Sequence, residues 1–379
     1  MIQPQRLTGP LTPLDAALRL LLDSVSAVTP ADVPIDEAFG CICAETRVSK
    51  VTIPEFDLAA TDGWALHAHD LVGATSYSPL QLTTPPPWVE AGARMPENCD
   101  CVVDSRLVET TGSMFQVIGE AAPGQGVRRA GEDVAAGEAV VAEGMHLNHF
   151  NLLAVNAAGL KRLKVRRPHV RIIDVPSRDG TSNSAQFVTG FARALGCRVT
   201  LTRTSARDAK AILASMDGEQ CDLLLTVGGT GSGRTDATID ALTSRGGALV
   251  HGIALQPGQT AAVSVKGNTL IVAIPGAPEQ AVAVCLAIVR PLLERLSARA
   301  PRQEGTMLPL ARKISSAIGF SEVALLELSG GQWIPGPAGH LSLGAVANAD
   351  AWLLVPGDSE GYAAGTAVAG LPLHEKRLP

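Results

Sequence analysis

The sequence predicts a multi-domain protein of the α/β and β classes, in which an α/β segment follows a β-rich one. Strands and helices alternate from Pro168 to about residue 299, whereas Gly, Pro and short alternating apolar runs fill residues 49–139. Short strands and turns return after Pro301. A chain of 379 residues that is 46% apolar and 18% charged is globular and long enough for roughly two to four domains.

Helices are expected on both sides of the β-rich segment. Residues 12–25 have a helical apolar periodicity, with Thr12 as the N-cap and Pro13 at the first helical position. Residues 147–160 have a similar pattern, with Asn148 as the cap. The β-rich segment is therefore predicted to be an insertion between two helical stretches.

The α/β segment predicts a mostly parallel sheet with helices on both faces. The strands are expected at 169–175, 197–204, 221–227 and 268–274, and the helices at 184–196, 206–216 and 279–296. Loops that leave the carboxyl ends of parallel strands meet in one crevice, where ligands bind. Two such loops, 228–233 and 275–278, consist largely of Gly and Pro, so we expect a ligand site beside them.

The first of these loops lies between an apolar strand and a predicted helix. Its residues are Gly228, Gly229, Thr230, Gly231, Ser232 and Gly233. Backbone amides that carry no side chains can surround an anion at a helix N-terminus. The loop lacks the lysine of a P-loop, and it does not follow the first strand of its domain, so neither a Walker site nor a dinucleotide site is expected. A tight turn built of small residues for packing is the alternative for an isolated loop of this kind.

Asp236 follows this loop, on the expected first turn of the next helix. An acid at that position interacts favourably with the helix dipole. A carboxylate beside a phosphate loop could also hold Mg²⁺ that bridges phosphate oxygens. The segment alone favours neither capping nor metal binding.

Composition excludes some classes of partner. The net charge of −6 argues against broad nucleic-acid binding, which needs a basic face. No apolar run reaches the ~18–20 residues that cross a bilayer, and the first residues do not resemble a signal peptide. We therefore expect a soluble, cytoplasmic protein without a membrane partner.

Cysteine and histidine spacings offer only weak metal signals. Cys41–Cys43 and Cys99–Cys101 have i, i+2 spacing, but no C-x-x-C pair occurs, so small buried apolar residues are the better interpretation. His67–His69 and His146–His149 have spacings that a metal could use. Each histidine pair lacks a nearby third ligand in sequence, and we expect surface histidines.

Four motifs together carry a family resemblance. They are FDxxAxDGxA at 56–65, RRxGEDxxxG at 128–137, GGxxxGxxDxxxxxL at 228–242 and PGxP at 275–278. In order and spacing they resemble the molybdopterin molybdenumtransferase family, the MoeA-type enzymes related to the gephyrin E domain. The likeness runs from about residue 12 to 375.

The resemblance implies a MoeA-like architecture of four domains. An elongated helical and strand domain would comprise residues 1–48 and 140–167, and a β-rich domain, 49–139, would be inserted in it. A three-layer α/β molybdopterin-binding domain would span 168–299, and a β-barrel-like domain would span 300–379. The family is dimeric, so the resemblance implies a homodimer.

The resemblance also implies an activity. Family members take adenylylated molybdopterin, hydrolyse it with Mg²⁺ and insert molybdate into the dithiolene. By resemblance, Asp62, Asp133 and Asp236 would be catalytic, and Asp236 would ligate Mg²⁺. The molybdopterin side would comprise the loop 228–233 together with Pro275, Gly276 and Pro278. Asp62 and Asp133 would reach the cleft from the other subunit; a molybdopterin adenylyltransferase and a recipient molybdoenzyme are possible protein partners.

The sequence departs from the family pattern where positive charge is expected. The family's K-P-G-K loop is here Gln256-Pro-Gly-Gln259, so neutral amides replace both lysines. Charge-assisted contacts contribute about 1–3 kcal/mol each, so the loss of both lysines predicts a loss of ~10²-fold or more in affinity. Arg178, Arg234 and Lys266 are candidates to replace them in part.

Other family motifs are altered as well. The S-T-G-[DN]-E-L loop after the first α/β strand is here Pro176–Ser182, without a glutamate, and the threonine of the T-G-A loop is Ala91. The G-R-x-x-[FY]-x-R motif appears as GFSEVALL at 319–326, without either arginine. These changes remove side chains expected at the catalytic site, whereas the motifs that carry the predicted fold are kept.

Three functions stay open from the sequence. The first is a divergent insertase acting on molybdopterin or a modified pterin, which the acids Asp62, Asp133 and Asp236 favour. The second is a non-catalytic molybdopterin-binding carrier or maturation partner for a molybdoenzyme, which the lost basic residues favour. The third is a scaffold that uses the dimer as a docking platform.

Overall fold

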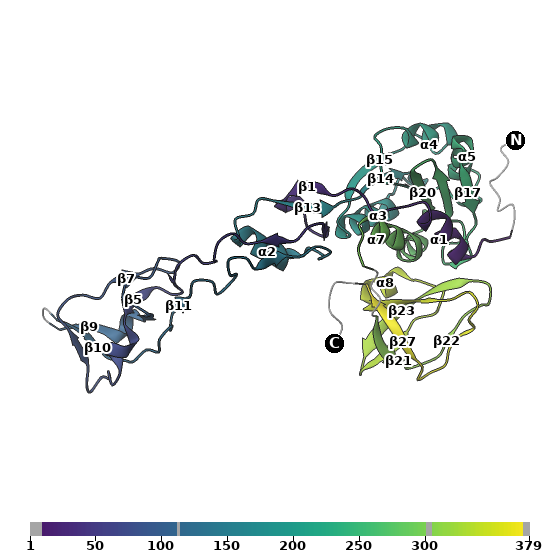
Figure 1. Ribbon diagram of the computed structural model, residues 1–379. Coiled ribbons are helices and arrows are strands. Elements are labelled where there is room, and N and C mark those ends of the chain that lie inside the picture. The colour runs from purple at the N-terminus through teal and green to yellow at the C-terminus, as the bar shows by residue number, and fades with distance from the viewer. Residues whose placement is uncertain (1–9, 112–113, 301–304, 374–379) are drawn as a thin grey trace. The chain divides into compact units, whose positions relative to one another are not determined.

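The computed structural model describes residues 10–111, 114–300 and 305–373 (Figure 1). The chain divides into two compact units. One comprises Met1–Ala44, Gly144–Asn148 and Arg162–Pro379, and the other comprises Glu45–Glu143 and His149–Lys161. The predicted insertion 49–139 lies within the second unit, while the four-domain division stays a prediction.

A six-stranded sheet forms the centre of the α/β part, as Figure 1 shows. In spatial order its strands are β15 (Arg198–Arg203), β14 (His169–Asp174), β16 (Leu223–Val227), β20 (Thr269–Ile274), β19 (Ala262–Lys266) and β17 (Ala248–His251). The first four pair in parallel, whereas β19 and β17 add an antiparallel edge. The predicted mostly parallel sheet is confirmed, and the two edge strands are an addition to the prediction.

Helices cover both faces of this sheet. They are α1 (Leu14–Leu22), α3 (Asn183–Ala194), α4 (Ala209–Met216), α5 (Thr238–Arg245), α6 (Pro278–Val284) and α7 (Arg290–Leu296). Side chains of α1, α3, α6 and α7 pack with Ile172 and Leu225, whereas those of α4 and α5 pack with Ile173 and Leu224. Successive strand residues point to opposite faces, so buried strands supply two cores, and the predicted three layers are confirmed.

The predicted helix 279–296 is present but changes its winding. A π-helical turn, Cys285–Val289, joins α6 to α7 just before Pro291. Proline lacks the amide hydrogen that the helix interior needs, and a π-turn is a common way to absorb such an interruption. The helix start at 278 keeps Pro278 beside the loop after β20.

The predicted role of Thr12 as a helix cap is wrong. Helix α1 begins at Leu14, and Pro13 takes the cap position without a side-chain hydrogen bond. The Thr12 amide donates to the Gly252 carbonyl at 2.9 Å, and its own carbonyl accepts from Ala254 at 2.8 Å. Backbone pairing with a distant segment therefore takes the place of local capping.

The remainder of the first unit is built mainly of strands, and the short strands predicted after Pro301 are present. A three-stranded sheet comprises β1 (Ala31–Pro34), β13 (Arg162–Arg166) and β2 (Ile42–Cys43). The C-terminal sheet comprises β18 (Leu255–Gln256), β23 (Ser321–Ser329), β25 (Ala351–Val355), β27 (Ala367–Pro372) and β21 (Thr306–Pro309), with β24 (Gln332–Pro335) paired to β23. Strands β22 (Ile314–Ser315) and β26 (Gly361–Tyr362) pair separately, and a short helix, α8 (Leu343–Asn348), was not predicted. The predicted start of this domain adjoins residues 301–304, outside the described residues.

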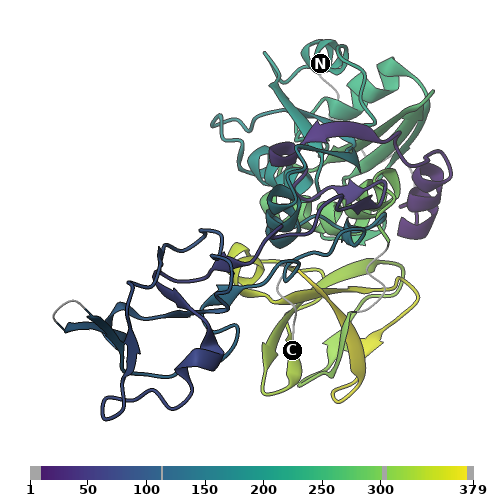
Figure 2. The ribbon, with the colours of Figure 1, turned by 60° about the vertical axis from the view of Figure 1, so that its left-hand side comes forward.

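The second unit contains short paired strands, an α-helix and short 3-10 helical turns (Figure 2). The pairs are β3 (Arg47–Val48) with β12 (Ala139–Val141), and β4 (Leu58–Ala59) with β11 (Val127–Arg128). The three-stranded sheets are β7 (Trp88–Val89), β5 (Gly63–Leu66), β8 (Cys101–Val103), and β6 (Leu80–Leu82), β10 (Met114–Val117), β9 (Val108–Thr111). The predicted second helix is α2 (His149–Ala157). Within the described residues of the whole chain, no helix has the length and apolar character needed to cross a membrane.

Candidate functional site: a cavity at the carboxyl edge of the sheet

A cavity of about 870 Å³ lies where β14, β16 and β20 end. The loops after these three strands line it, so the predicted crevice is present. Of the residues predicted for the molybdopterin side, those that line the cavity are Gly228, Gly229, Thr230, Gly231, Ser232, Pro275, Gly276 and Pro278, and Asp236 lines it too. Gly233 is not among the lining residues, although it contacts Asp236.

The first two glycines of the loop are required because neighbouring atoms approach their backbone closely. Gly228 and Gly229 have φ angles of +102° and +71°. A Cβ at Gly228 would lie 2.4 Å from the Val175 carbonyl oxygen, and one at Gly229 would lie 2.6 Å from the Thr238 hydroxyl. Only glycine fits both constraints, and it lets the loop after β16 lie directly against the loop after β14.

Hydrogen bonds from three directions hold the glycine loop. The buried Thr238 hydroxyl donates to the Gly228 carbonyl at 2.7 Å, and the Thr238 amide donates to Gly229 at 3.0 Å. The Thr230 and Thr260 hydroxyls are 3.2 Å apart. These contacts fix the backbone amides of the loop in place before any ligand binds.

His251 is the third support, and no sequence motif indicated it. Its Nε2 lies 3.2 Å from the Thr230 carbonyl, which can only accept, so Nε2 carries the hydrogen. Burial lowers the pKa of His251, and the hydrogen bond to Thr230 opposes this effect. A neutral imidazole therefore supports the loop at neutral pH.

Asp236 does not lie on a helical turn, and this prediction is wrong. Helix α5 begins at Thr238 with Ala237 at its cap position. The Asp236 carboxylate instead turns back to the loop, where one oxygen accepts from the Gly233 amide at 3.0 Å. Its other oxygen accepts from Arg207 at 2.9 Å. Both oxygens of this carboxylate are thus engaged within the chain.

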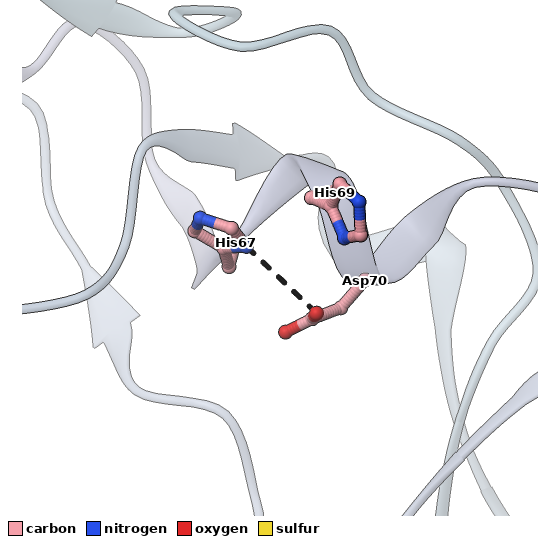
Figure 3. Close-up of side chains that lie close together, drawn as sticks. All are labelled: His67, His69 and Asp70. Carbon is pink, nitrogen blue, oxygen red and sulfur yellow. Dashed lines mark ion pairs between the residues drawn. The ribbon is translucent and has the colours of Figure 1, made fainter.

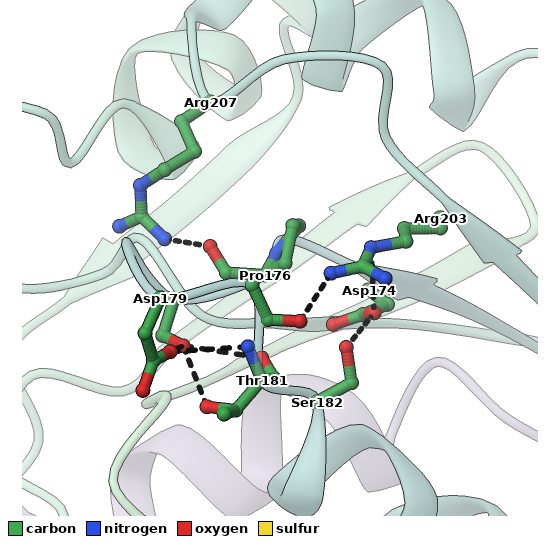
Figure 4. A network of polar contacts seen from close by, with 9 residues as sticks. Asp174, Pro176, Asp179, Thr181, Ser182, Arg203 and Arg207 are labelled. Atoms are coloured by element: carbon green, nitrogen blue, oxygen red, sulfur yellow. Dashed lines mark hydrogen bonds and ion pairs between the residues drawn. The ribbon is translucent and has the colours of Figure 1, made fainter.

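Arg207 is a lining residue that the sequence did not single out. It lies immediately before the N-cap of α4, Asp208, in a segment with no recognisable motif. Its guanidinium donates to the Pro176 carbonyl, as Figure 4 shows. Because it also donates to Asp236, it bridges the loop after β14 to the loop after β16. Topology brings this arginine to the cavity wall.

The loop after β14 has its own polar network, which Figure 4 shows. The Asp174 carboxylate accepts from the Ser182 hydroxyl and lies 3.7 Å from Arg203, whose guanidinium also donates to the Gly180 carbonyl at 2.5 Å. Hydrogen bonds from the Ser177 hydroxyl and then the Thr181 backbone lower the pKa of Asp179 to about 2. The altered loop is therefore ordered by internal contacts rather than by a glutamate.

The carboxylates of the cavity do not fit the magnesium ion that the family resemblance implies. Mg²⁺ needs carboxylate oxygens that are free to enter an octahedral shell. Asp174, Asp179 and Asp236 each accept hydrogen bonds from the chain, and arginines pair with the first and last. Among the described residues, the cavity contains no group of three His, Cys, Asp or Glu side chains spaced to hold a metal.

The three residues expected to replace the family lysines differ in their position relative to the cavity. Arg178 lines the cavity, whereas Arg234 is exposed beside the glycine loop and does not line it. The prediction for Lys266 is wrong, because its ammonium donates to the Arg245 carbonyl at 2.5 Å. Lys266 pairs with Thr269 at the start of β20, at the sheet edge opposite the cavity.

The glutamines that replace the family lysines do not line the cavity. Gln256 belongs to β18 and pairs with Glu322 of the C-terminal sheet. The carbonyl of Gln259 accepts from Ile253 at 3.1 Å, and the next residue, Thr260, does line the cavity. This segment links the C-terminal sheet to the rim of the site without contributing charge.

Asp62 and Asp133 belong to the second unit. Asp62 accepts a hydrogen bond from the Ala91 amide at 2.7 Å, and Asp133 forms an ion pair with Arg128. Strands β4 and β11 pair the two motifs that contain these acids, and Asp57 adds a bond from the Ala130 amide at 2.7 Å. Two motifs far apart in sequence are thus neighbours, while the catalytic role of their acids stays a prediction.

The histidine pair at 67–69 has a third potential ligand, contrary to the prediction. Ligand atoms of His67, His69 and Asp70 all lie within 4.8 Å of one another. His67 Nδ1 and the Asp70 carboxylate are 3.8 Å apart, as Figure 3 shows. All three side chains are exposed, as expected for surface histidines.

The cysteines follow the predicted apolar interpretation. Cys41, Cys43 and Cys101 are buried, and Cys99 is partly exposed. All seven cysteines lie within the described residues, and none forms a disulfide. Their burial accounts for the spacing without a metal.

Comparison with known proteins agrees with this architecture. Residues 12–159 match the family model "MoeA N-terminal region (domain I and II)", and residues 172–295 match "Probable molybdopterin binding domain". A Mycobacterium tuberculosis protein named molybdopterin molybdenumtransferase 2 is 29% identical over 92% of this chain and 96% of its own length. A Synechococcus elongatus molybdopterin molybdenumtransferase is 26% identical over 93% and 97%.

A solved structure extends the likeness to the fold. The crystal structure of the molybdopterin biosynthesis moeA protein from Pyrococcus horikoshii OT3 is 26% identical, with a TM-score of 0.62, and covers 94% of this chain and 98% of that one. The two family models match consecutive segments of the chain, and the likeness in structure continues beyond both. From its motifs, its sheet topology and these matches, the chain is a divergent member of the MoeA family.

Proposed function

We propose that this chain binds molybdopterin or adenylylated molybdopterin in the cavity at the end of the sheet, as a step in molybdenum cofactor biosynthesis. The observation that carries the proposal is the glycine loop 228–233, which borders a cavity of about 870 Å³ inside the segment that matches a molybdopterin-binding model. That volume lies in the range of small-molecule sites, about 300–1,000 Å³. The names of the relatives support the same pathway.

The cavity walls suit a ligand with an anionic end. Backbone amides of the glycine loop and the guanidinium groups of Arg178 and Arg207 provide donors for phosphate oxygens. Helix α3 directs its first turn to the same space, since Asn183 and Ser184 line the cavity and Ser182 makes no capping bond. The Ser184 hydroxyl donates to the Gly276 carbonyl at 2.7 Å and so ties this helix to the loop 275–278.

Molybdate insertion is the reaction that the relatives' names favour. In that reaction Asp62 and Asp133 would act from the second unit of a partner subunit in a homodimer. The exposed Phe150 and Leu153, one turn apart on α2, support a dimer, because exposed apolar side chains on one helix face are typical of an interface. Positioning and electrostatics would do most of the catalytic work.

A molybdopterin carrier or maturation partner is the second candidate, and a specific observation favours it. Arg207 pairs with Asp236, the residue expected to ligate Mg²⁺ for hydrolysis. Gln256 and Gln259 also leave the neighbouring loop without charge. The geometry therefore supports binding of the pterin more strongly than metal-dependent hydrolysis.

One experiment separates these functions. The purified chain is incubated with molybdopterin or with adenylylated molybdopterin, each with molybdate and with or without Mg²⁺, and bound pterin and released AMP are both measured. Binding with AMP release that Asp62→Asn abolishes supports the insertase, whereas binding without AMP release supports the carrier. If neither pterin form binds, the proposed function is wrong.

A further inference from the structure

We infer that the cavity holds the phosphate of its ligand through Arg207 without a divalent metal, and that Asp236 positions Arg207 and the glycine loop instead of ligating a metal. The inference rests on the proposed function, since it concerns the same cavity. It assigns to Arg207 the role of an anion-binding residue. It also assigns Asp236 a positioning role in place of the predicted metal site.

Arg207 is preorganised at the cavity wall. One terminal nitrogen donates to the Pro176 carbonyl and the other donates to Asp236 at 2.9 Å, so two loops fix the plane of the guanidinium. Its Nε is buried and has no hydrogen-bond partner among the described residues. An arginine has five N–H donors, and a phosphate offers the acceptors that the remaining ones need.

The Asp236 carboxylate packs against the backbone of the glycine loop. A Cβ at Gly231 or at Gly233 would each lie 2.9 Å from the same carboxylate oxygen, which also accepts from the Gly233 amide. The other oxygen faces Arg207. The side chain is 18% exposed, so the pair lies in a partly shielded environment where opposite charges attract more strongly than in water.

A metal ion at Asp236 would have to displace the guanidinium. An arginine guanidinium is positively charged in proteins, so a divalent cation beside Arg207 would meet like-charge repulsion. The phosphate, in contrast, carries the charge that complements both Arg207 and the loop amides. A phosphate and the arginine can therefore share this place, whereas Mg²⁺ and the arginine compete for it.

The remaining acids of the cavity give no alternative metal site. Asp174 is buried against Ser182 and Arg203. Asp179 accepts hydrogen bonds from the Ser177 hydroxyl and the Thr181 amide. These contacts lie within the loop after β14 and set its conformation. The metal-free interpretation therefore holds for the lining residues as a group and not only for Asp236.

The test uses inorganic phosphate as the probe and isothermal titration calorimetry of the full chain, in EDTA and with added Mg²⁺. We expect equal affinity within about twofold in both buffers. Arg207→Gln should weaken binding about 10- to 100-fold, because it removes a charge-assisted contact. Asp236→Asn keeps an acceptor for Gly233 and should lower the affinity much less than Arg207→Gln does.

Arg234→Gln is the matched control, since Arg234 is exposed beside the loop but does not line the cavity. It should bind phosphate as the unaltered chain does, and thermal unfolding of each variant shows whether it is folded. Three results overturn the inference: no phosphate binding in EDTA, binding that Asp236→Asn abolishes, or full affinity in a folded Arg207→Gln variant. If phosphate binds without metal but molybdopterin does not bind, the inference stands and the proposed function fails.

Discussion

Arg207 and Asp236 form a salt bridge of 2.9 Å across the wall of the cavity, although 29 positions separate them in sequence. The bridge joins the segment before α4 to the end of the glycine loop. It turns an expected metal ligand into a structural anchor and brings a guanidinium to the place where an anion would bind. Several consequences of this arrangement and of the contacts around it are open to measurement.

Gly228→Ala should destabilise the protein. The added Cβ would meet the Val175 carbonyl oxygen at 2.4 Å, and the φ angle of +102° is strained for alanine. Strain of this kind costs roughly 1–3 kcal/mol. Urea unfolding measures the change in the free energy of unfolding.

Gly190→Ala is the control for that substitution. Gly190 is exposed within α3, and a Cβ there would meet no atom within 4 Å. Alanine should stabilise the helix by about 0.5–1 kcal/mol. Equal effects of the two substitutions would contradict the packing described for the glycine loop.

Thr238→Val should weaken the attachment of the glycine loop to the start of α5. The substitution removes the buried hydroxyl that donates to the Gly228 carbonyl at 2.7 Å, and leaves that acceptor without this donor. We expect a loss of about 1–3 kcal/mol in the free energy of unfolding, and weaker phosphate binding. Thr238→Ser keeps the hydroxyl, so it should retain the phosphate affinity; a serine variant as weak as the valine variant would argue against the hydrogen bond as the cause.

His251 should make the stability depend on pH. Because burial lowers its pKa in the folded state below the ordinary value of 6.5, the unfolded chain binds the proton first as the pH falls. The free energy of unfolding should therefore decrease below about pH 6.5 and down to the lower pKa of the folded state. Urea unfolding at several pH values measures this slope.

Comparison of two variants isolates the His251 contribution. His251→Gln can still donate to the Thr230 carbonyl but does not titrate, so its stability should fall less on acidification. Substitution of the exposed His69 by Gln should leave the slope as in the unaltered chain. An unchanged slope in His251→Gln would show that other groups cause it.

The cysteines should differ in reactivity. Burial raises the pKa of Cys41 and Cys101 to about 11 and that of Cys197 to about 12, so their thiolates are scarce at pH 8. Only the partly exposed Cys99 and Cys221 should react with a disulfide reagent before unfolding, and slowly, since burial raises the pKa of both. Counting modified thiols by mass spectrometry checks this; rapid labelling of Cys197 in the folded chain would contradict its burial.

The sequence predicted the parts of the fold that depend on local periodicity. Apolar strands such as 223–227 and the Gly- and Pro-rich loops that follow them placed the crevice at the correct edge of the sheet. The antiparallel strands β17 and β19 were not predicted. These strands are only four and five residues long, so they carry little periodic signal, although their partners lie near in sequence: Lys266 of β19 pairs with Thr269 of β20.

Errors arose where a distant partner decides the conformation. Thr12 pairs with the 252–254 segment instead of capping a helix, and Lys266 donates to Arg245 away from the cavity. Arg207 and His251 were missed for the same reason, because neither belongs to a motif. Their roles follow from the tertiary contacts that bring them to the glycine loop.

The most direct test is equilibrium binding of molybdopterin to the purified chain in EDTA, for the unaltered protein and for Arg207→Gln. We expect binding without metal and a loss of about 10-fold or more in affinity in the variant. Binding that appears only with Mg²⁺, or that is the same in a folded Arg207→Gln variant, would contradict it.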